Sequence, residues 1–557
     1  MRDSIFSSPG QALGGLWQNI PRTIKLTFAA TFIFGLLVHG YMLANFLVNH
    51  DGISYFAYFS PSSPTNSPPT LSSGRWLQEI AILFTGYIPT PWVTGLMSVL
   101  YLSITASIIV ACLEIKRTYC AILIGLILAT FPAAGVVFAY IQVADSIFLS
   151  ILLACLSAYL SRKFRFGVIF GAILLALSLG IVQTYITFTA GLFLIMLILD
   201  TLSKKESAKT ILLRGIKYAA CLALGLILYF VILWLTLRIR DVSLTAYQGI
   251  DQMGRISLTE LPSQIRTAYR EFFTFFTQHP YWFLSARLQR VSRLIFTLPL
   301  ILIPAMMALI AAKNWSGAKA QRESSKDRKR RMWHTMPYLC LLALFALLFP
   351  LAVNAIYIMG AHFIYLMLLY ASVLVFVLLI SLLDRLEVSL QGIQSSVKKH
   401  LGAFACWISL AVLLFAPYNY FVVLNGNYLQ TDLALRQVYH ISSTLAGRVR
   451  AFPGYEEGMP VVLVGHHSAS STMVMHQLSA HNAMVGFGTT NALINNPFAY
   501  TYFFHTFLGE SLTLRFLRDE ALREEHYEAL SELAVFPAEG SMQVIDGMLF
   551  IRVSEDF

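Results

Sequence analysis

The stretch YCAILIGLILATFPAAGVVFAYIQVADSIFLSILLACLSAYL, residues 119–160, decides the fold class. Asp145 is its only charged residue. A helix needs about 20 apolar residues to cross the hydrocarbon layer of a bilayer. The stretch therefore predicts two membrane crossings, at 119–139 and 145–161, which are joined by a short polar turn.

Similar apolar stretches recur on both sides of this one. Together they predict eleven membrane-spanning helices, near 25–47, 91–113, 119–139, 145–161, 166–183, 185–200, 216–237, 294–312, 336–353, 361–383 and 402–424. The strands of a membrane β-barrel alternate apolar and polar residues over about 10 positions, and these stretches do not alternate. The sequence thus predicts an α-helical polytopic membrane protein.

The overall composition agrees with that prediction. Of 557 residues, 57% are hydrophobic and 12% are charged, whereas soluble globular proteins carry roughly 25% charged residues. The formal net charge is +11. A nucleic-acid-binding protein gathers its basic residues on a solvated face, but here they stand in short runs between apolar stretches. Composition therefore excludes an ordinary soluble enzyme, a disordered chain and a protein that binds nucleic acid.

The basic residues also predict the orientation, because Lys and Arg are enriched in cytoplasmic loops. With a cytoplasmic N-terminus, 24 of the 40 basic residues fall on the inner side, including all 13 Lys, and the 16 on the outer side are all Arg. The first apolar stretch is too long for a cleavable signal peptide. We expect a cytoplasmic N-terminus and an extracytoplasmic C-terminus.

Two outer loops are not spans. The loop 48–90 has a Pro- and Ser-rich middle, and its apolar end, Leu77–Tyr87, predicts a helix in the membrane interface. The loop 238–293 holds eight Arg and no Lys, and Ile265–Phe276 predicts a second interfacial helix. Four aromatic residues are expected on one side of that helix: Tyr269, Phe272, Phe273 and Phe276.

The C-terminal part of the chain has the charge content of a soluble domain. Its local patterns predict a buried strand and turn at Pro460–Gly465, a charged surface helix at Arg518–Leu533, and a hairpin at Met542–Val553 that turns at Asp546-Gly547. We therefore expect a transmembrane domain at 1–424 and a small extracytoplasmic α/β domain at 425–557.

Polar residues at the outer ends of the helices are candidates for catalysis. Asp51 follows the first span and precedes Gly52, so it fits either a turn residue or a general base at the membrane edge. Asp145 opens the fourth span, where it fits either a helix N-cap or a second carboxylate that faces the same cavity. Gln183 and Tyr185, between the fifth and sixth spans, either line a polar cavity or cap helices.

Outer arginines are candidates for binding a lipid phosphate. Arg287, Arg290 and Arg293 recur every three residues and so share a helix face, and Arg75 precedes the second span. Each fits a side chain that snorkels to the headgroups. Together they also fit a phosphate site, because Arg presents a fixed fork of donors. No CxxC, HExxH or His-rich spacing predicts a metal site, and we expect no cofactor.

Several short motifs occur in a characteristic order. They are Asn49-His50-Asp51, Ser73-Gly74-Arg75-Trp76, Ala144-Asp145-Ser146, the run from Leu179 to Tyr185, Phe536-Pro537, Gly540-Ser541-Met542 and Ile545-Asp546-Gly547. In this order and placement the chain resembles the bacterial glucosyl transferase type II family of O-antigen glucosylating systems. The resemblance implies an integral-membrane glycosyltransferase of the GT-C type.

The resemblance also implies a reaction. Such enzymes take a sugar from a polyprenyl-phosphate donor on the outer side of the bacterial cytoplasmic membrane and pass it to a glycan acceptor such as O-antigen. Asp51 would then be the general base, Asp145 a second carboxylate, and Arg75, with Arg290 or Arg287, the ligand of the leaving phosphate. Membrane lipid, a partner flippase and a donor-synthesising glycosyltransferase are the implied partners. The chain has no Asp-x-Asp motif, which favours an inverting mechanism without a metal.

Two other functions stay open. A flippase or transporter of lipid-linked saccharides would use the outer Arg and aromatic residues only to gather lipid. A non-catalytic partner in polymer assembly would act through its outer C-terminal domain. An ion-coupled transporter usually keeps ionisable residues deep in its spans, and this chain has almost none there, which favours the transferase over a proton-driven carrier.

Overall fold

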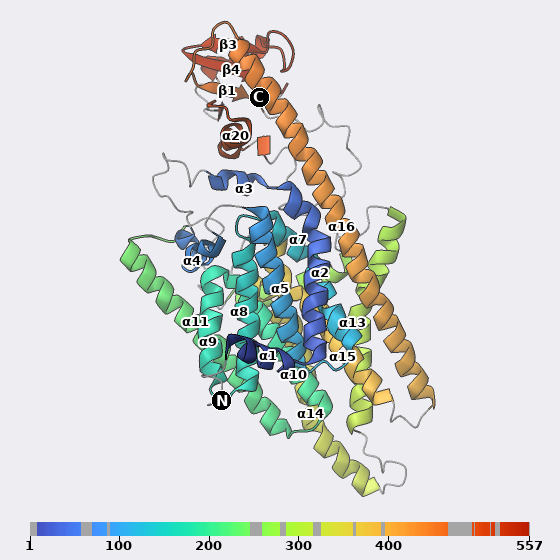
Figure 1. The fold of residues 1–557 in the computed structure, drawn as a ribbon. Helices are drawn as coiled ribbons and strands as arrows, with labels where there is room; N and C mark the ends of the chain where they lie inside the picture. The colour runs from blue at the N-terminus through green and yellow to red at the C-terminus, as the bar shows by residue number, and fades with distance from the viewer. Residues whose placement is uncertain are drawn as a thin grey trace.

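Long apolar stretches form long helices because a backbone in lipid has to satisfy its own hydrogen bonds. A computed structural model shows a bundle of such helices with a small domain at one end (Figure 1). The structure describes residues 8–56, 70–85, 90–245, 259–278, 286–315, 325–359, 364–390, 396–465, 493–494, 496–512, 514–517 and 524–555.

Within those residues, nine helices are long and apolar enough to cross a membrane. The spans are formed by α2 (Arg22–Asn45), α5 (Pro91–Leu113), α8 (Ala144–Lys163), η4 and α10 (Gln183–Tyr185 and Ile186–Ser203), α11 (Ala208–Arg240), α13 (Ala286–Trp315), α14 (Ser325–Val353), η8 and α15 (Leu366–Val373 and Leu374–Leu390) and α16 (Ser396–Ala451). The chain is therefore a multi-pass membrane protein, as the sequence predicts.

The count differs from the expected eleven in two places. The predicted span at 119–139 is two helices, α6 (Thr118–Thr130) and α7 (Pro132–Ala139), bent by 44° at Pro132. Counted as one span, this bent pair brings the number in the described residues to ten. The predicted span at 166–183 is α9 (Gly167–Ile181), an apolar helix of 15 residues that packs along α8 and is shorter than the roughly 20 residues of a typical crossing.

The helices differ in how much of their surface faces the rest of the protein. The span containing α15 is 83% buried and forms the centre of the bundle, whereas α11 is 22% buried and lies at its edge. Small residues allow close crossings: a Cβ atom added to Gly125 of α6 would clash with Thr31 Oγ1 of α2. His39 of α2 is buried, and its ring bonds to Tyr428 Oη at 2.6 Å and to the Ala129 carbonyl at 2.9 Å.

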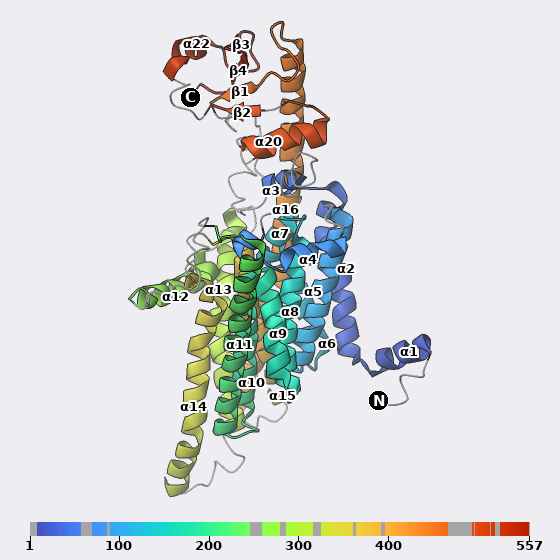
Figure 2. The same ribbon diagram turned by 90° about the vertical axis from the view of Figure 1, so that its left-hand side faces the viewer.

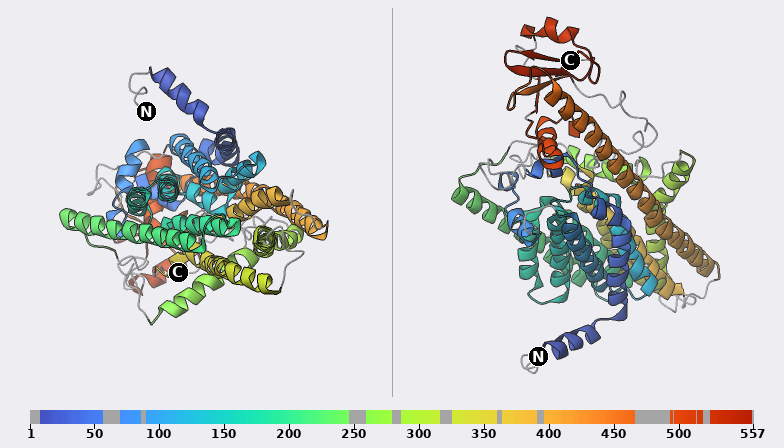
Figure 3. Two further views of the ribbon diagram at one scale, coloured as in Figure 1. Left: turned by 90° about the horizontal axis from the view of Figure 1, so that it is seen from below. Right: turned by 45° about the horizontal axis from the view of Figure 1, so that its top comes forward.

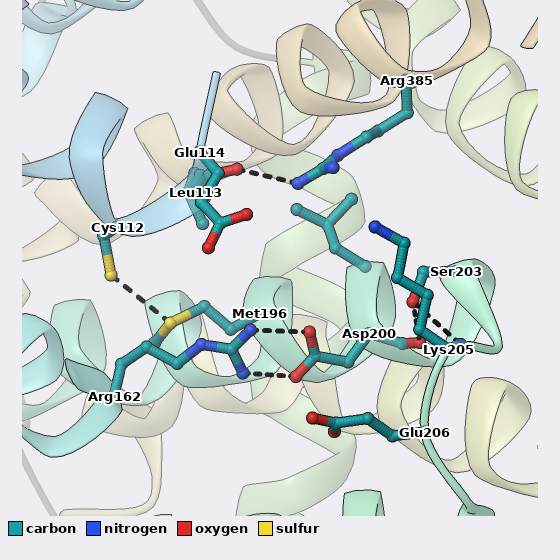
Figure 4. Close-up of a pocket in the computed structure, with 11 residues that line it drawn as sticks. Cys112, Leu113, Glu114, Arg162, Met196, Asp200, Ser203, Lys205, Glu206 and Arg385 are labelled. Atoms are coloured by element: carbon teal, nitrogen blue, oxygen red, sulfur yellow. Dashed lines mark hydrogen bonds and ion pairs between the residues drawn. The ribbon is translucent and has the colours of Figure 1, made fainter. Parts of the chain in front are cut away.

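The two ends of the bundle carry different groups. The N-terminus lies at one end, and the C-terminal domain lies at the other, which we call the domain end (Figure 1). At the N-terminal end, loops that the sequence assigns to the cytoplasmic side meet around a cavity of about 130 Å³, lined by Glu114, Arg162, Lys205 and Arg385 among others (Figure 4). The basic turns of the predicted inner side thus lie together.

One helix joins the bundle to the C-terminal domain. α16 has 56 residues, which corresponds to about 84 Å at 1.5 Å per residue, and it leaves the bundle to continue into the domain (Figure 3, orange). The predicted division at residue 424 falls inside this helix, so one uninterrupted helix belongs to both parts of the chain.

The C-terminal domain contains a small mixed sheet in the order β2-β1-β4-β3. Its strands are β1 (Val461–Val464), β2 (Leu514–Phe516), β3 (Met542–Ile545) and β4 (Met548–Arg552). β1 is parallel to both β2 and β4, and β3 and β4 form an antiparallel hairpin. The predicted strand and hairpin are confirmed. Asp546 and Gly547 have φ angles of 49° and 74°, as a type I′ turn requires.

The predicted surface helix of this domain is only partly visible. The structure places α22 at Tyr527–Glu532, and residues 518–523 of the prediction lie outside the described residues. A further helix, α20 (Pro497–Phe503), followed by a π-helical turn, η9 (Phe504–Leu508), contacts the domain end of the bundle.

Short elements cover the domain end. They are α3 (His50–Ser54), η2 (Leu71–Ser73), α4 (Gln78–Ile82), η3 (Leu83–Thr85) and α12 (Leu261–Gln278). The interfacial helix expected at Leu77–Tyr87 is thus a short α-helix and a 3-10 turn, and the Pro-rich middle of that loop lies outside the described residues. α12 confirms a helix at the second predicted position. Phe273 is 49% exposed while Phe272 and Phe276 are buried, so the aromatic residues of this helix do not share one side.

Candidate functional site

A tight loop at the domain end positions Arg75. Gly74 has a φ of 76°, which is unfavourable for residues with a side chain, and its N–H donates to the Leu71 carbonyl at 2.8 Å. A Cβ atom on Gly74 would lie 2.8 Å from Gln183 Nε2. The Leu77 N–H donates to the Gly180 carbonyl at 2.8 Å, which fixes the far side of the loop to the end of α9. The backbone on both sides of Arg75 is therefore held.

The surroundings of Arg75 are polar but not acidic. Three tyrosine hydroxyls, those of Tyr185, Tyr229 and Tyr140, act electrostatically on its guanidinium group. Among the described residues no carboxylate forms an ion pair with Arg75, and its buried Nε has no hydrogen-bond partner there. Loss of hydration on burial lowers the pKa of Arg75 below its ordinary value. The group stays charged, so this position favours an anion.

Tyr229 is a site residue that sequence reasoning missed. It belongs to α11, in the predicted span 216–237, and its hydroxyl donates to the Gly74 carbonyl at 3.1 Å. Gln183 Nε2 donates to Tyr229 Oη at 3.2 Å and to the Ser73 carbonyl at 2.8 Å. These bonds tie α11 and the turn before α10 to the loop of Arg75. The available signal was a tyrosine within the apolar stretch 219–235 of α11.

Gln183 and Tyr185 lie beside the loop of Arg75. Both belong to η4, the 3-10 turn that connects α9 to α10. Tyr185 is 1% exposed, and its hydroxyl donates to the Met367 carbonyl at 3.3 Å. The structure therefore brings Arg75, Gln183 and Tyr185 together from separate parts of the sequence.

Asp145 lies in the first turn of α8, after the N-cap residue Val143. The N-cap interpretation of Asp145 is therefore wrong by two positions, although a carboxylate in the first turn still meets the positive end of the helix dipole. Thr85 of η3 donates its hydroxyl to Asp145 Oδ2 at 3.0 Å. Asp145 Oδ1 is buried and has no hydrogen-bond partner among the described residues.

Asp51 is the second residue of α3. Asn49 is the N-cap of this helix, and its side chain accepts a hydrogen bond from the Gly52 N–H at 2.9 Å. The Asp51 side chain is 54% exposed, and its Oδ1 lies 3.5 Å from His50 Nε2. α3 rests on the turn that precedes α8, since a Cβ atom on Gly52 would lie 3.1 Å from Gln142 Oε1. Asp51 thus lies in a capped helix, open to solvent, beside the segment that carries Tyr140 and Asp145.

The remaining two candidates lie on α13. Arg290 is exposed, and within the described part of the chain no hydrogen bond or ion pair joins it to the loop of Arg75. Only the backbone of Arg287 is described. The described contacts therefore do not join Arg290 to Arg75.

Buried polar atoms without a hydrogen-bond partner are concentrated at the domain end. Six of them, counted within the described residues, are Asn49 Nδ2, Arg75 Nε, Trp76 Nε1, Gln78 Oε1, Gln142 Oε1 and Asp145 Oδ1. Native proteins leave only a few such atoms per 100 residues. We call Asp51, these six residues, Gln183, Tyr185 and Tyr229 the outer polar site. In the same described part of the chain, no group of three or more His, Cys, Asp and Glu residues could hold a metal ion.

Comparison with known proteins identifies the family. The family model for Glucosyl transferase GtrII matches residues 40–378, which include the whole outer polar site and exclude the C-terminal domain. No curated protein and no solved structure matches the chain. Because the match covers well over half of the sequence, the chain belongs to the glucosyl transferase GtrII family.

Proposed function

We propose that the chain moves a glucosyl or similar hexosyl group from a polyprenyl-phosphate donor to an envelope glycan, and that the outer polar site is the reaction centre. Membership of the family supports transfer of a glucosyl group. The observation that carries the choice of donor is Arg75, a cation with a buried Nε and no carboxylate partner among the described residues. A phosphate is an anion that a guanidinium group binds with two parallel hydrogen bonds.

The position of Arg75 favours a phosphate that is attached to a lipid. Tyr229, which bonds to the carbonyl of the adjacent Gly74, lies on α11. Other side chains of that helix point away from the protein: Ile227 is 57% exposed and Trp234 is 54% exposed. In a membrane these side chains face the acyl chains. A polyprenyl tail can therefore stay in the bilayer while its phosphate reaches Arg75 beside α11.

The proposed reaction is a single displacement with inversion at the anomeric carbon. Asp51 accepts the proton of the acceptor hydroxyl as that oxygen bonds to the anomeric carbon. The bond between this carbon and the phosphate oxygen breaks on the opposite face, and its electrons go to the polyprenyl phosphate. Arg75 stabilises the charge that develops on the leaving phosphate. Asp51 then returns its proton to water, to which its side chain is open.

Asp145, Gln183 and Tyr185 would orient the substrates. Asp145 Oδ1 and Gln142 Oε1 are buried acceptors without a partner among the described residues, and sugar hydroxyls are donors of the matching kind. The predicted orientation places this end of the bundle on the outer side of a bacterial cytoplasmic membrane, because all the Lys residues then lie inside.

Substitution of Asp51 tests the proposal. Purified Asp51→Asn protein should transfer labelled glucose from polyprenyl-phosphate glucose roughly 10²–10⁴-fold more slowly than the native protein, at the same protein yield. Asp241→Asn is a matched control, because Asp241 is an exposed acid at the same end of the bundle, in a left-handed conformation that Asn also adopts. Unchanged turnover in Asp51→Asn would overturn the assignment of the base. Movement of the lipid across the bilayer without a glycosylated product would favour the flippase instead.

A further inference from the structure

A groove of about 260 Å³ lies in the C-terminal domain, between the end of α16 and the loop that leads into β3. Arg448 and Phe452 line it from the side of α16, and Phe536, Glu539 and Ser541 from the side of the loop. The end of α16 and the β3 strand lie at the part of the domain farthest from the bundle (Figures 1 and 2). The groove is therefore separate from the outer polar site.

The loop that forms one wall is held by backbone hydrogen bonds. The Phe536 N–H donates to the Arg552 carbonyl at 2.8 Å, and the Ala534 N–H donates to the Gly540 carbonyl at 3.2 Å. Gly540 has a φ of 80°, a conformation that favours glycine. The loop is thus fixed against strand β4 in the shape that lines the groove. It contains the motifs Phe536-Pro537 and Gly540-Ser541-Met542, which the reaction centre does not use.

The chemistry of the groove suits a sugar. Phe452 and Phe536 are half-buried and offer apolar ring surface to the C–H groups of a pyranose. Arg448 and Glu539 are exposed, and neither forms an ion pair within the described residues. Hydroxyl groups both donate and accept, so a sugar can accept from Arg448 and donate to Glu539. A charged ligand would meet one group of its own sign, and an apolar peptide would leave both without partners.

We propose that this groove binds one sugar unit of the acceptor glycan, an inference that rests on the proposed function. Its volume is just below the range of roughly 300–1,000 Å³ that is common for drug-sized ligands, which suits a single sugar or two. Because α20 and α3 lie between the groove and the bundle (Figure 2), the sugar in the groove is not the one that reacts. The acceptor is therefore a polymer long enough to occupy both places.

Transfer kinetics with long and short acceptors test this inference. The double variant Arg448→Gln, Glu539→Gln should raise the KM for a long-chain O-antigen polysaccharide roughly tenfold, the effect of losing one or two hydrogen bonds to charged groups. The KM for the isolated repeat unit, the KM for the donor and kcat should not change. The matched control is Arg515→Gln, Glu456→Gln, which removes the same charges from exposed positions elsewhere in the domain. Equal KM values for the long acceptor in both double variants would overturn the inference.

A binding measurement separates this inference from the proposed function. Calorimetry with the long-chain polysaccharide uses intact Asp51→Asn protein, with and without the two groove substitutions, and needs no turnover. Weaker binding in the groove variant supports the groove even where transfer itself is not observed. Unchanged binding in the groove variant overturns the groove and leaves the reaction centre unaffected.

Discussion

Arg162 and Arg75 lie at opposite ends of the helix bundle and differ in their partners. Arg162 donates two hydrogen bonds to the carboxylate of Asp200 (Figure 4). Asp200 also pairs with Arg214, and Arg214 in turn pairs with Glu206 at 2.7 Å. Arg75 has tyrosine hydroxyls near it and, among the described residues, no carboxylate that forms an ion pair with it. Arginine thus has carboxylate partners from the protein at one end of the bundle and, among the described residues, none at the other.

The difference separates a structural arginine from a candidate binding residue. Burial of a cation is costly unless an anion compensates for the lost hydration. At the N-terminal end the protein supplies that anion itself. At the domain end the compensation is partial, and perturbed, incompletely paired charges are common where a ligand completes the set. The comparison predicts that mutations at the two ends change different properties.

Substitution of Arg75 should have the largest effect on activity. In Arg75→Gln, glucosyl transfer should fall roughly 10²–10³-fold, because one donor to the developing phosphate charge is lost. The melting temperature should not fall, because no protein carboxylate among the described residues loses a partner. Labelled-donor assays and thermal unfolding of the same preparation measure the two properties. A marked fall in melting temperature with normal activity would show that Arg75 is structural, like Arg162.

Substitution of Asp200 should have the opposite pattern. In Asp200→Asn, Arg162 and Arg214 lose their shared carboxylate, and since the Asp200 side chain is 16% exposed, the free energy of unfolding should fall by about 2–3 kcal/mol. Glu206→Gln is the matched control, because Glu206 is 43% exposed and such pairs contribute about 0–1 kcal/mol. The activity of the folded fraction should stay normal in both. Equal stability losses in the two variants would contradict the comparison.

Local sequence patterns predict the spans because the bilayer imposes one requirement, about 20 apolar residues, on each crossing. The same patterns predict the hairpin at Asp546-Gly547, because a type I′ turn needs a positive φ at two adjacent residues. Hydropathy marks where a helix leaves the membrane but not where the helix ends. The predicted span at 402–424 is therefore only part of α16, which continues to Ala451.

The partners of Arg75 could not be predicted in the same way. Tyr229 and Gly74 are 155 residues apart, and only the packing of α11 against α9 and the loop of Arg75 brings them together. The sequence shows that three candidates lie at the same depth, where a span meets the outer side of the membrane: Arg75, Gln183 and Tyr185. Arg287 and Arg290 are predicted at that depth too, but they lie on α13. Depth alone does not indicate which side of the bundle a helix occupies.

Tyr229 therefore offers the finest test of the comparison. In Tyr229→Phe the hydroxyl no longer bonds to the Gly74 carbonyl or to Gln183, so Arg75 loses part of its support without losing its charge. The KM for the donor should rise roughly fivefold, as expected for the loss of about 1 kcal/mol, while the KM for the acceptor stays the same. A merely structural role would lower the melting temperature and leave the donor KM unaltered.

Tyr218→Phe is the matched control, because Tyr218 is also a buried tyrosine of α11 but lies near Arg162, at the other end of the bundle. Its ring stacks on Phe193, with ring centroids 4.1 Å apart. If both variants shift the donor KM equally, the effect belongs to α11 as a whole, and Tyr229 does not position Arg75.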